Sequence, residues 1–319
     1  MEYYVALDVG GNSIKAAALN AGTLKPLEGL DIMYEKVSNT FTYSKITTVM
    51  NYLADQIITR LDSRPPSGIG ISLAGLIDNR DFTIAQSPNL PALNGKNLLR
   101  DISENYQCPM SMLNDALSFT LGEYARYDRR TSPFIGITLG TGIGGGVIID
   151  QKPFIGYRGY GFEVGHMNIE SPGPVCSCGR SGCLEAFCGG FSLKRFYIAE
   201  CLEKGIPVSE DIEISKIAEL AGKNDTAATD LFHRMGRYLG RGIGSVLNLF
   251  NPQVIVLGGK ISKSFDLFKK PFFEELEIHS YSATFNDVTV EVSADSDLRH
   301  FTGCCLVFKR KELDNFVLY

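Results

Sequence analysis

Short hydrophobic runs that end in glycine or in polar residues divide the chain into alternating strands and helices. Residues 3–8 predict a strand, residues 10–13 a tight turn with two glycines, and residues 14–19 a second strand, as in a β-hairpin. The same strand, glycine turn and strand recur about one domain length later, with Gly140 in the place of Gly10. This repeated pattern predicts two related α/β domains.

Helical spacing of hydrophobic residues indicates the helices that alternate with the strands. Residues 45–61 predict an amphipathic helix with Ser44 as its N-cap, and residues 116–127 and 231–250 predict two more. In the last helix every fourth residue is glycine over one stretch, which would let a second backbone come close: Gly236, Gly240 and Gly244. Further strands are expected at residues 68–73, 110–113, 134–138, 147–150 and 253–257. This alternation places the chain in the α/β class.

Composition and charge restrict the partners of the chain. Of its 319 residues, 44% are hydrophobic and 21% are charged, which is ordinary for a soluble globular protein. A net charge of −5 makes the chain a poor binder of nucleic acid and of anionic membranes. Its first residues predict a strand instead of a signal peptide, and its apolar segments are too short to span a bilayer. We therefore expect a cytoplasmic protein whose partners include neither nucleic acid nor a membrane.

The two glycine turns have the composition of phosphate-binding loops. In the first, Asp8 ends a strand and the glycines let backbone N–H groups approach an anion, with Asp8 reaching the phosphates through Mg²⁺ or its water. A plain hairpin explains this turn equally well. The second turn, residues 140–146, holds five glycines and Thr141, far more glycine than a simple hairpin needs. Strands flank it on both sides, whereas the dinucleotide-binding fingerprint requires a helix after the glycines.

Asn114 and Asp115 stand at the carboxyl end of the strand predicted at residues 110–113. Ligands of open α/β sheets bind beyond this edge. Phosphoryl transfer needs a carboxylate that accepts the proton of the attacking hydroxyl, so Asp115 is a candidate general base. Asn and Asp also cap helix N-termini, and spacing alone favours that structural role.

A cysteine cluster has the spacing of a metal site. Cys176, Cys178 and Cys183 lie in one glycine-rich loop, and His166 precedes them by ten residues. Three thiolates and one imidazole make a tetrahedral Zn²⁺ site, and four protein ligands leave no open position, so the metal would be structural. A disulfide and chance clustering would explain the same spacing, although clustered cysteines in a reducing compartment more often bind metal. Cys188 could substitute as a ligand.

Carboxylates flank this cluster in the sequence. Glu163 lies three residues before His166, and Glu185 lies two residues after Cys183. Groups that accept hydrogen bonds from hydroxyls suit a sugar, so Glu163, His166 and Glu185 are candidate sugar ligands. Support of the metal ligands or plain solvation would explain the same residues. The other histidines lack partner spacing and are expected to be structural: His233, His279 and His300.

Together these motifs resemble the ROK family of sugar kinases and related repressors. Residues 163–166 are similar to its Glu-x-Gly-His sugar motif, and residues 176–185 match its Cys-x-Cys-Gly-x-x-Gly-Cys-x-Glu signature at every defined position. Residues 8–15 and 140–146 resemble its two phosphate segments. Residues 254–259 resemble its adenosine segment, and residues 114–116 its catalytic Asp motif. The resemblance extends from residue 3 to about residue 308. Asn12 departs from it, because the family usually has Thr there.

The resemblance implies an α/β, actin-like ATPase (ribonuclease H-like) two-domain fold, with ATP and a sugar in the interdomain cleft. The implied small domain is residues 1–116 with a returning C-terminal helix at about 303–319, and the large domain is residues 117–302 with the zinc loop. Family members are commonly homodimers, so a homodimer is expected.

The resemblance also implies roles for single residues. Asp115 would be the general base. The hexose would contact Asn89, Asn114, Asp115, Glu163, His166 and Glu185. ATP and Mg²⁺ would contact Asp8, Gly10, Gly11, Asn12, Lys15, Gly140, Thr141, Gly142, Gly144, Gly258 and Gly259. Structural Zn²⁺ would be bound by His166, Cys176, Cys178 and Cys183.

These roles predict transfer of the ATP γ-phosphoryl group to a hexose, at O6 of an aldohexose such as glucose, allose or N-acetylglucosamine. A sugar-responsive repressor is a rival hypothesis, and repressors of the family carry a DNA-binding helix-turn-helix before the first phosphate segment. That segment starts at residue 3 here, which we expect to leave no room for one. Two further hypotheses are a catalytic zinc hydrolase, which the closed ligand set opposes, and a non-catalytic sugar-binding protein. Motif spacing does not decide among hexose epimers.

Overall fold

The computed structural model describes residues 2–128 and 130–318, which form two compact units. Unit 1 contains the described residues up to Arg130, Gly146–Phe162 and the described residues from Asp295 on. Unit 2 contains Thr131–Gly145 and Glu163–Ala294. This division differs from the expected domains, because residues 117–130 and 146–162 belong to unit 1 and the C-terminal return begins at residue 295 instead of about 303.

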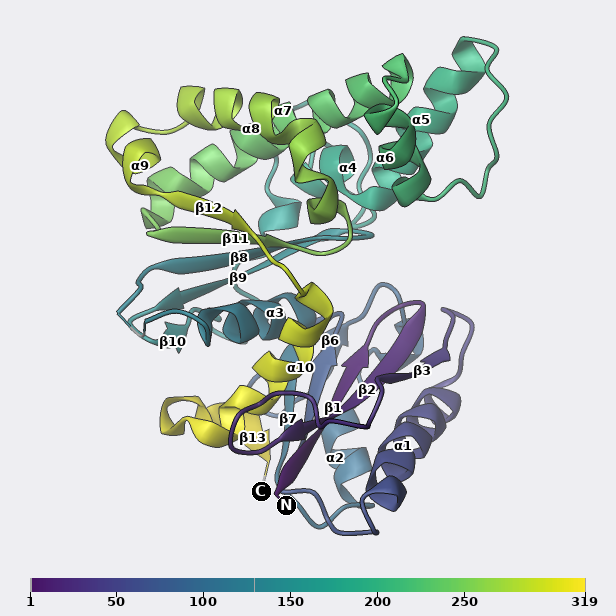
Figure 1. The fold of residues 1–319 in the computed structure, drawn as a ribbon, viewed down its shortest axis with the longest axis vertical. Helices are drawn as coiled ribbons and strands as arrows, with labels where there is room; N and C mark the ends of the chain where they lie inside the picture. The colour runs from purple at the N-terminus through teal and green to yellow at the C-terminus, as the bar shows by residue number, and fades with distance from the viewer. Residues whose placement is uncertain (1, 129, 319) are drawn as a thin grey trace. The chain divides into compact units, whose positions relative to one another are not determined.

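A six-stranded mixed sheet forms the centre of unit 1 (Figure 1). β1 pairs in parallel with β4, and β4 with β7, whereas β2 is antiparallel to both β1 and β3, which confirms the predicted hairpin. The carboxyl ends of β1, β4 and β7 therefore meet at one edge of the sheet. In order across the sheet the strands are β13 (Val317–Leu318), β7 (Met110–Asn114), β4 (Gly68–Leu73), β1 (Tyr3–Val9), β2 (Ser13–Asn20) and β3 (Met33–Lys36).

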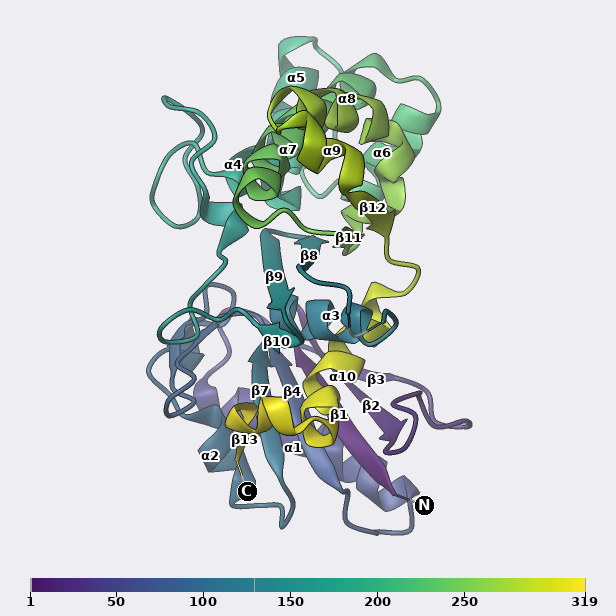
Figure 2. The same ribbon diagram turned by 90° about the vertical axis from the view of Figure 1, so that its left-hand side faces the viewer.

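Helices cover both faces of this sheet. α1 (Tyr43–Arg60) and α2 (Leu98–Ser103) lie on one face, and α10 (Ser296–Leu306) lies on the other and packs against α3 (Asp115–Tyr124) (Figures 1 and 2). Because both faces are covered, every residue of β4 is buried. The short elements of this unit are β5 (Leu76–Ile77), β6 (Ile84–Gln86), η1 (Pro91–Leu93), η4 (Val307–Lys309) and η5 (Lys311–Phe316).

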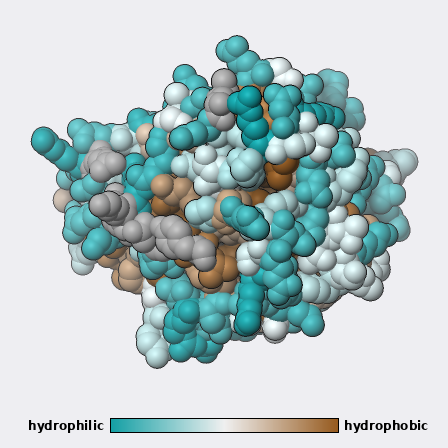
Figure 3. Space-filling model, turned by 90° about the horizontal axis from the view of Figure 1, so that it is seen from below, coloured by the Kyte–Doolittle hydropathy of each residue, from teal (hydrophilic) through white to brown (hydrophobic). Residues whose placement is uncertain are grey.

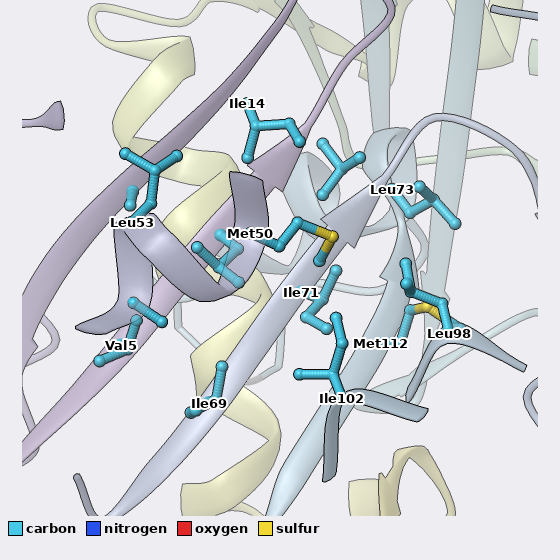
Figure 4. Packing of buried hydrophobic residues seen from close by; sticks show 14 of the residues in the cluster. Val5, Ile14, Met50, Leu53, Ile69, Ile71, Leu73, Leu98, Ile102 and Met112 are labelled. Carbon is cyan, nitrogen blue, oxygen red and sulfur yellow. The ribbon is translucent and has the colours of Figure 1, made fainter. Parts of the chain in front are cut away.

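The core of unit 1 lies between the sheet and the pair α1 and α2 (Figure 4). Ile69 and Ile71 on β4 point toward Met50 of α1 and Ile102 of α2. On the opposite face, a Cβ added to Gly70 would lie 2.7 Å from the carbonyl oxygen of Cys304, so this glycine lets α10 pack closely on β4.

A second sheet has the strand order β10, β9, β8, β11 and β12. The division between the units falls within β9, so β8, β11, β12 and the start of β9 belong to unit 2, whereas the end of β9 and β10 belong to unit 1. β11 runs parallel to both β8 and β12. The strands are β8 (Phe134–Leu139), β9 (Ile143–Ile149), β10 (Lys152–Pro153), β11 (Val254–Gly258) and β12 (Thr289–Val292). The helices of unit 2 are η2 (Val164–His166), α4 (Leu184–Cys188), α5 (Gly190–Glu203), α6 (Ile214–Gly222), α7 (Thr226–Phe250), η3 (Ile261–Ser264), α8 (Phe265–Ile278) and α9 (Ser282–Asp287).

The glycines of α7 allow the close helix contact that their spacing predicted. A Cβ on Gly236 would lie 2.6 Å from the carbonyl oxygen of Phe268, and one on Gly240 would lie 2.3 Å from that of Phe272. Both oxygens belong to α8, so the backbones of α7 and α8 pack directly against each other.

Two predicted helix starts are wrong. α1 begins at Tyr43, and Thr42 is its N-cap in place of Ser44, because Thr42 has an extended backbone and its Oγ1 accepts a hydrogen bond from Lys45 N at 3.3 Å. α7 begins five residues before the predicted residue 231, at Thr226. There Asp225 caps the helix by accepting a hydrogen bond from Ala228 N at 2.8 Å.

Among the described residues, no helix is long and apolar enough to cross a membrane. On the face seen in Figure 3, hydrophilic residues surround a smaller group of hydrophobic ones.

Candidate functional site

The first glycine turn follows β1 in unit 1 and brings several of the expected phosphate ligands together. Asp8 pairs with Lys15 on β2 and Ser72 on β4, and the Ser72 hydroxyl donates to Asp8 Oδ1 at 3.1 Å. Gly10 N donates to Ser13 O at 3.1 Å, which closes the turn. A Cβ on Gly11 would lie 2.5 Å from the Cβ of Asn89, so this glycine lets Asn89 pack against the turn.

The other two expected phosphate ligands of this turn point in different directions. The Asn12 side chain is exposed, while its carbonyl accepts a hydrogen bond from Val37 N at 3.1 Å. The Lys15 ammonium pairs with Asp297 of α10 at 2.8 Å. Lys15 therefore links β2 to the start of α10, and its contact with a phosphate stays a prediction.

The start of α3 separates the two roles that the sequence left open for Asn114 and Asp115. Asn114 is the N-cap: its Oδ1 accepts from Leu117 N at 3.1 Å and its Nδ2 donates to Gly75 O at 3.0 Å. Both polar ends of Asn114 are thus used inside the protein. Asp115 is the first helical residue, and its Oδ1 accepts a hydrogen bond from Ala116 N at 2.9 Å.

The surroundings of Asp115 shift its pKa. Burial raises its pKa above the ordinary value for aspartate, the neighbouring His300 lowers it, and the negative charge of Asp8 raises it again. Part of the residue's surface still reaches solvent. The two carboxylates therefore lie close enough to interact, and Asp115 can take up a proton more readily than an exposed aspartate.

His300 contacts Asp115 directly. It lies on α10, and its Nδ1 is 3.1 Å from the backbone carbonyl oxygen of Asp115. The spacing of histidines in the sequence gave no sign of this contact. His300 was expected to be structural, and the fold places it beside the candidate base.

In unit 2, Glu185 holds the second glycine turn. Its Oε2 accepts a hydrogen bond from Ile143 N at 2.9 Å, and a Cβ on Gly142 would lie 2.2 Å from that oxygen. Its Oε1 accepts from the Ser177 hydroxyl at 2.9 Å. Glu185 thus bridges the glycine turn and the cysteine loop, a role that the motif alone did not reveal.

The remaining glycines of the expected nucleotide site lie at the same edge of the second sheet. Gly140 accepts a hydrogen bond from Gly190 N at 2.9 Å, and the Thr141 side chain is exposed. Gly258 ends β11 beside β8, and Gly259 has a φ of +85°. A Cβ on Gly259 would lie 2.3 Å from the carbonyl oxygen of Leu139, so only glycine fits this close approach.

His166 and the three cysteines come together as the sequence predicted. Their ligand atoms all lie within 4.8 Å of one another, with Cys178 Sγ 3.7 Å from Cys183 Sγ and Cys176 Sγ 3.7 Å from His166 Nδ1. Zn–S bonds of about 2.3 Å in a tetrahedron put two sulfurs about 3.8 Å apart, so the donor set fits Zn²⁺. A disulfide, with an S–S bond of about 2.0 Å, does not match these separations.

Close backbone contacts shape the loop around this cluster. Gly182 has a φ of +79°, and a Cβ there would lie 1.9 Å from the carbonyl oxygen of Glu170. Cys188 lies outside the cluster, because it is buried in α4 and its thiol donates to Met235 O at 3.4 Å.

The Glu-x-Gly-His segment lies against the second glycine turn. A Cβ on Gly165 would lie 2.1 Å from the carbonyl oxygen of Ile143, so the segment packs on the first residue of β9. His166 N donates to Glu163 O at 3.0 Å within η2, and Glu163 is exposed. Because His166 turns Nδ1 toward Cys176, its Nε2 is the nitrogen that remains for another partner.

The chain is similar in sequence to known proteins over most of its length. The sequence pattern of the ROK family matches residues 4–311. The glucokinase of Thermotoga maritima is 27% identical over 280 residues, covering 85% of this chain and 86% of that protein. The xylose repressor of Bacillus subtilis is 31% identical over 291 residues, covering 89% of this chain and 71% of the repressor.

A solved structure matches nearly the whole fold. The ROK family glucokinase from Streptomyces griseus, in complex with glucose and AMPPNP, has a TM-score of 0.78 and 25% identity, covering 95% of this chain and 98% of that one. The predicted α/β, actin-like ATPase fold is confirmed.

Proposed function

The chain belongs to the ROK family, and from this premise we propose that it is an ATP-dependent kinase that phosphorylates a hexose at a hydroxyl group, O6 of an aldohexose. The observation that carries the proposal is Asp115 at the start of α3. Asn114 takes the helix cap, so the Asp115 carboxylate is not needed for that task; it accepts one hydrogen bond from Ala116 N at 2.9 Å and lies next to Asp8 and His300.

The proposed reaction assigns one proton transfer to the protein. As the sugar oxygen bonds to the γ-phosphorus, the bond from that phosphorus to the β–γ bridging oxygen breaks and ADP leaves. The Asp115 carboxylate accepts the hydroxyl proton and later releases it to water. Mg²⁺, placed through Asp8 or a water on it, would neutralise charge on the phosphates when bound.

The remaining expected ligands take positioning roles in this proposal. Asn89, held against Gly11, and Glu163 and His166 would bind sugar hydroxyls. Asn114 and Glu185 would act mainly by positioning neighbouring residues, because their side-chain polar atoms already form hydrogen bonds within the protein. The glycine turns would bring the backbone close to ATP at Gly10, Gly11, Gly140, Gly142, Gly144, Gly258 and Gly259. The N–H groups of Gly10 and Gly140 already donate to Ser13 O and Gly142 O, so these two glycines would shape the turns.

We also propose that His166 and the three cysteines bind a structural zinc ion. Its support is the donor set and the sulfur separations of the cluster. One Glu185 oxygen lies 3.6 Å from Cys176 Sγ, within hydrogen-bond reach of the thiol. Zinc would therefore fix the loop that positions both His166 and Glu185, without taking part in the chemistry.

The test is an ADP-release assay with glucose, allose, N-acetylglucosamine, mannose, fructose, N-acetylmannosamine and xylose. We expect ADP release that depends on at least one hexose and yields an acid-stable sugar phosphate. Xylose is included because a xylose repressor is among the relatives. A sugar that binds by calorimetry without any ADP release would contradict the kinase and favour a sugar-responsive regulator.

The contact between His300 and Asp115 predicts a change in pH dependence. A general base must be ionised, so activity falls as pH drops through the Asp115 pKa. His300 lowers this pKa, and His300→Asn should raise it. The acidic limb of kcat/KM against pH should therefore move to higher pH, with activity kept in the alkaline range, where Asp115 is ionised in both proteins. His233→Asn, at an exposed position of unit 2, is the control and should keep the parental profile. An equal loss of activity at every pH would indicate a purely structural role for His300.

A further inference from the structure

Unit 1 contains a cavity whose lining includes none of the residues assigned above. Its volume is about 680 Å³, within the range of about 300–1,000 Å³ typical of small-molecule sites. Three segments line it: residues 23–26 after β2, residues 125–126 at the end of α3, and residues of α10, η4 and Arg310. We call this cavity the basic pocket.

The lining of the basic pocket is strongly cationic. Among its twelve described lining residues none is acidic, and five are basic: Lys25, Arg126, Arg299, Lys309 and Arg310. Behind the wall, the buried Glu123 pairs with Arg126 at 2.8 Å and with Arg299 at 3.4 Å. Five cations thus face one carboxylate, in a chain whose net charge is −5. The pocket therefore has a local preference for anions that the whole chain lacks.

The cations are held in place by the fold. Asn20 Oδ1 accepts hydrogen bonds at 2.9 Å from two successive backbone amides of the loop after β2. The Lys309 ammonium donates to Gly22 O in that loop, and the Arg310 guanidinium lies 5.6 Å from the centre of the Tyr124 ring. A Cβ on Gly122 would lie 2.1 Å from the carbonyl oxygen of Arg299, so α3 and α10 pack closely here. Such restraint lowers the entropy lost when a ligand binds.

Most of the other lining residues are apolar, and the two exceptions are Thr23 and Thr302. Leu24 and Leu306 are buried, and Pro26 and Leu298 lie in the same lining. A bare inorganic ion would leave this part of the cavity unused. The combination suits a ligand that has an anionic group and a small carbon skeleton.

We propose that the basic pocket binds a small organic phosphate, with its phosphate on the lysines and arginines and its carbon skeleton against the leucines. Arginine and lysine side chains bind phosphate through charge-assisted hydrogen bonds, and arginine can bind two oxygens at once. The bound ligand lies at the opposite end of α3 from Asp115. The proposal needs no kinase activity and is tested without it.

The test is calorimetric titration of the full chain at low salt with phenyl phosphate and with inorganic phosphate. We expect phenyl phosphate to bind more tightly, because inorganic phosphate lacks a carbon skeleton. The double variant Lys25→Gln/Lys309→Gln should bind phenyl phosphate about tenfold more weakly or worse. Lys45→Gln, at an exposed lysine on α1 outside the pocket, is the matched control and should keep the parental affinity.

A second variant separates the cavity from its charge. Ala125 is exposed and has helical backbone angles, so Ala125→Phe should fold while narrowing the pocket and leaving all five cations in place. It should weaken phenyl phosphate more than inorganic phosphate. Circular dichroism confirms that each variant is folded. Two results would overturn the proposal: no binding to the parent at millimolar phenyl phosphate, or parental affinity in both folded variants, which would place binding at the glycine turns instead.

Discussion

Replacing Asp115 by asparagine is expected to lower kcat for the best hexose by roughly 10²–10⁴, the usual contribution of a positioned general base. The amide has nearly the same shape and cannot accept the hydroxyl proton. The KM values for hexose and ATP should stay close to the parental ones, because the cap at Asn114 and the glycine turns are untouched. Single-turnover kinetics would separate the chemical step from product release.

Stability distinguishes loss of the base from loss of the fold. Burial raises the Asp115 pKa, so at neutral pH its ionised form is less favourable in the folded than in the unfolded chain. Asp115→Asn removes this cost, and Tm at pH 7 should be equal to or above that of the parent. Asp62→Asn, at an exposed residue with a φ of +58° that asparagine also adopts, is the control for the same chemical change. A kcat near the parental value in Asp115→Asn would leave Asp115 with no catalytic role.

Local patterns predicted the parts of the site that local chemistry determines. The spacing of Cys176, Cys178 and Cys183 identified the loop that the fold closes around His166, because glycines between the ligands permit its tight turns. The recurrence of glycine in α7 likewise predicted a close helix neighbour. Glycine destabilises the interior of a helix, and a close approach of a second backbone explains why it is used there.

Contacts between segments that are distant in the sequence could not be predicted from it. Glu185 and Ile143 are 42 residues apart, and His300 and Asp115 are 185 residues apart, so no motif could indicate either contact. The choice between Asn114 and Asp115 as the helix cap was also open. It depends on backbone angles at the strand end, and both residue types are good caps. The start of α1 was misplaced for the same reason, since Thr42 and Ser44 both suit an N-cap.

Removing one ligand of the proposed zinc site should disturb hexose binding more than ATP binding. In Cys178→Ser, zinc content should fall from one ion per chain toward none, and Tm should drop by several degrees. The hexose KM should rise about tenfold or more, because the metal no longer fixes His166 and the loop that reaches Glu185. The ATP KM should change less, because Gly190 N still holds Gly140 O at 2.9 Å.

The matched control for this experiment is Cys108→Ser, the same chemical change at a partly buried cysteine of unit 1 outside the cluster. It should keep parental zinc content and both parental KM values. Unfolding could imitate the expected loss, so the comparison uses Cys178→Ser only at temperatures where circular dichroism matches the parent. Zinc content is measured on the same samples. A folded, zinc-free Cys178→Ser protein with the parental hexose KM would show that the cluster only stabilises the loop and does not position His166 or Glu185 for the sugar. If ATP binding suffers as much as hexose binding, the contact from Glu185 Oε2 to Ile143 N is the main path from the cluster, and the second glycine turn depends on the metal directly.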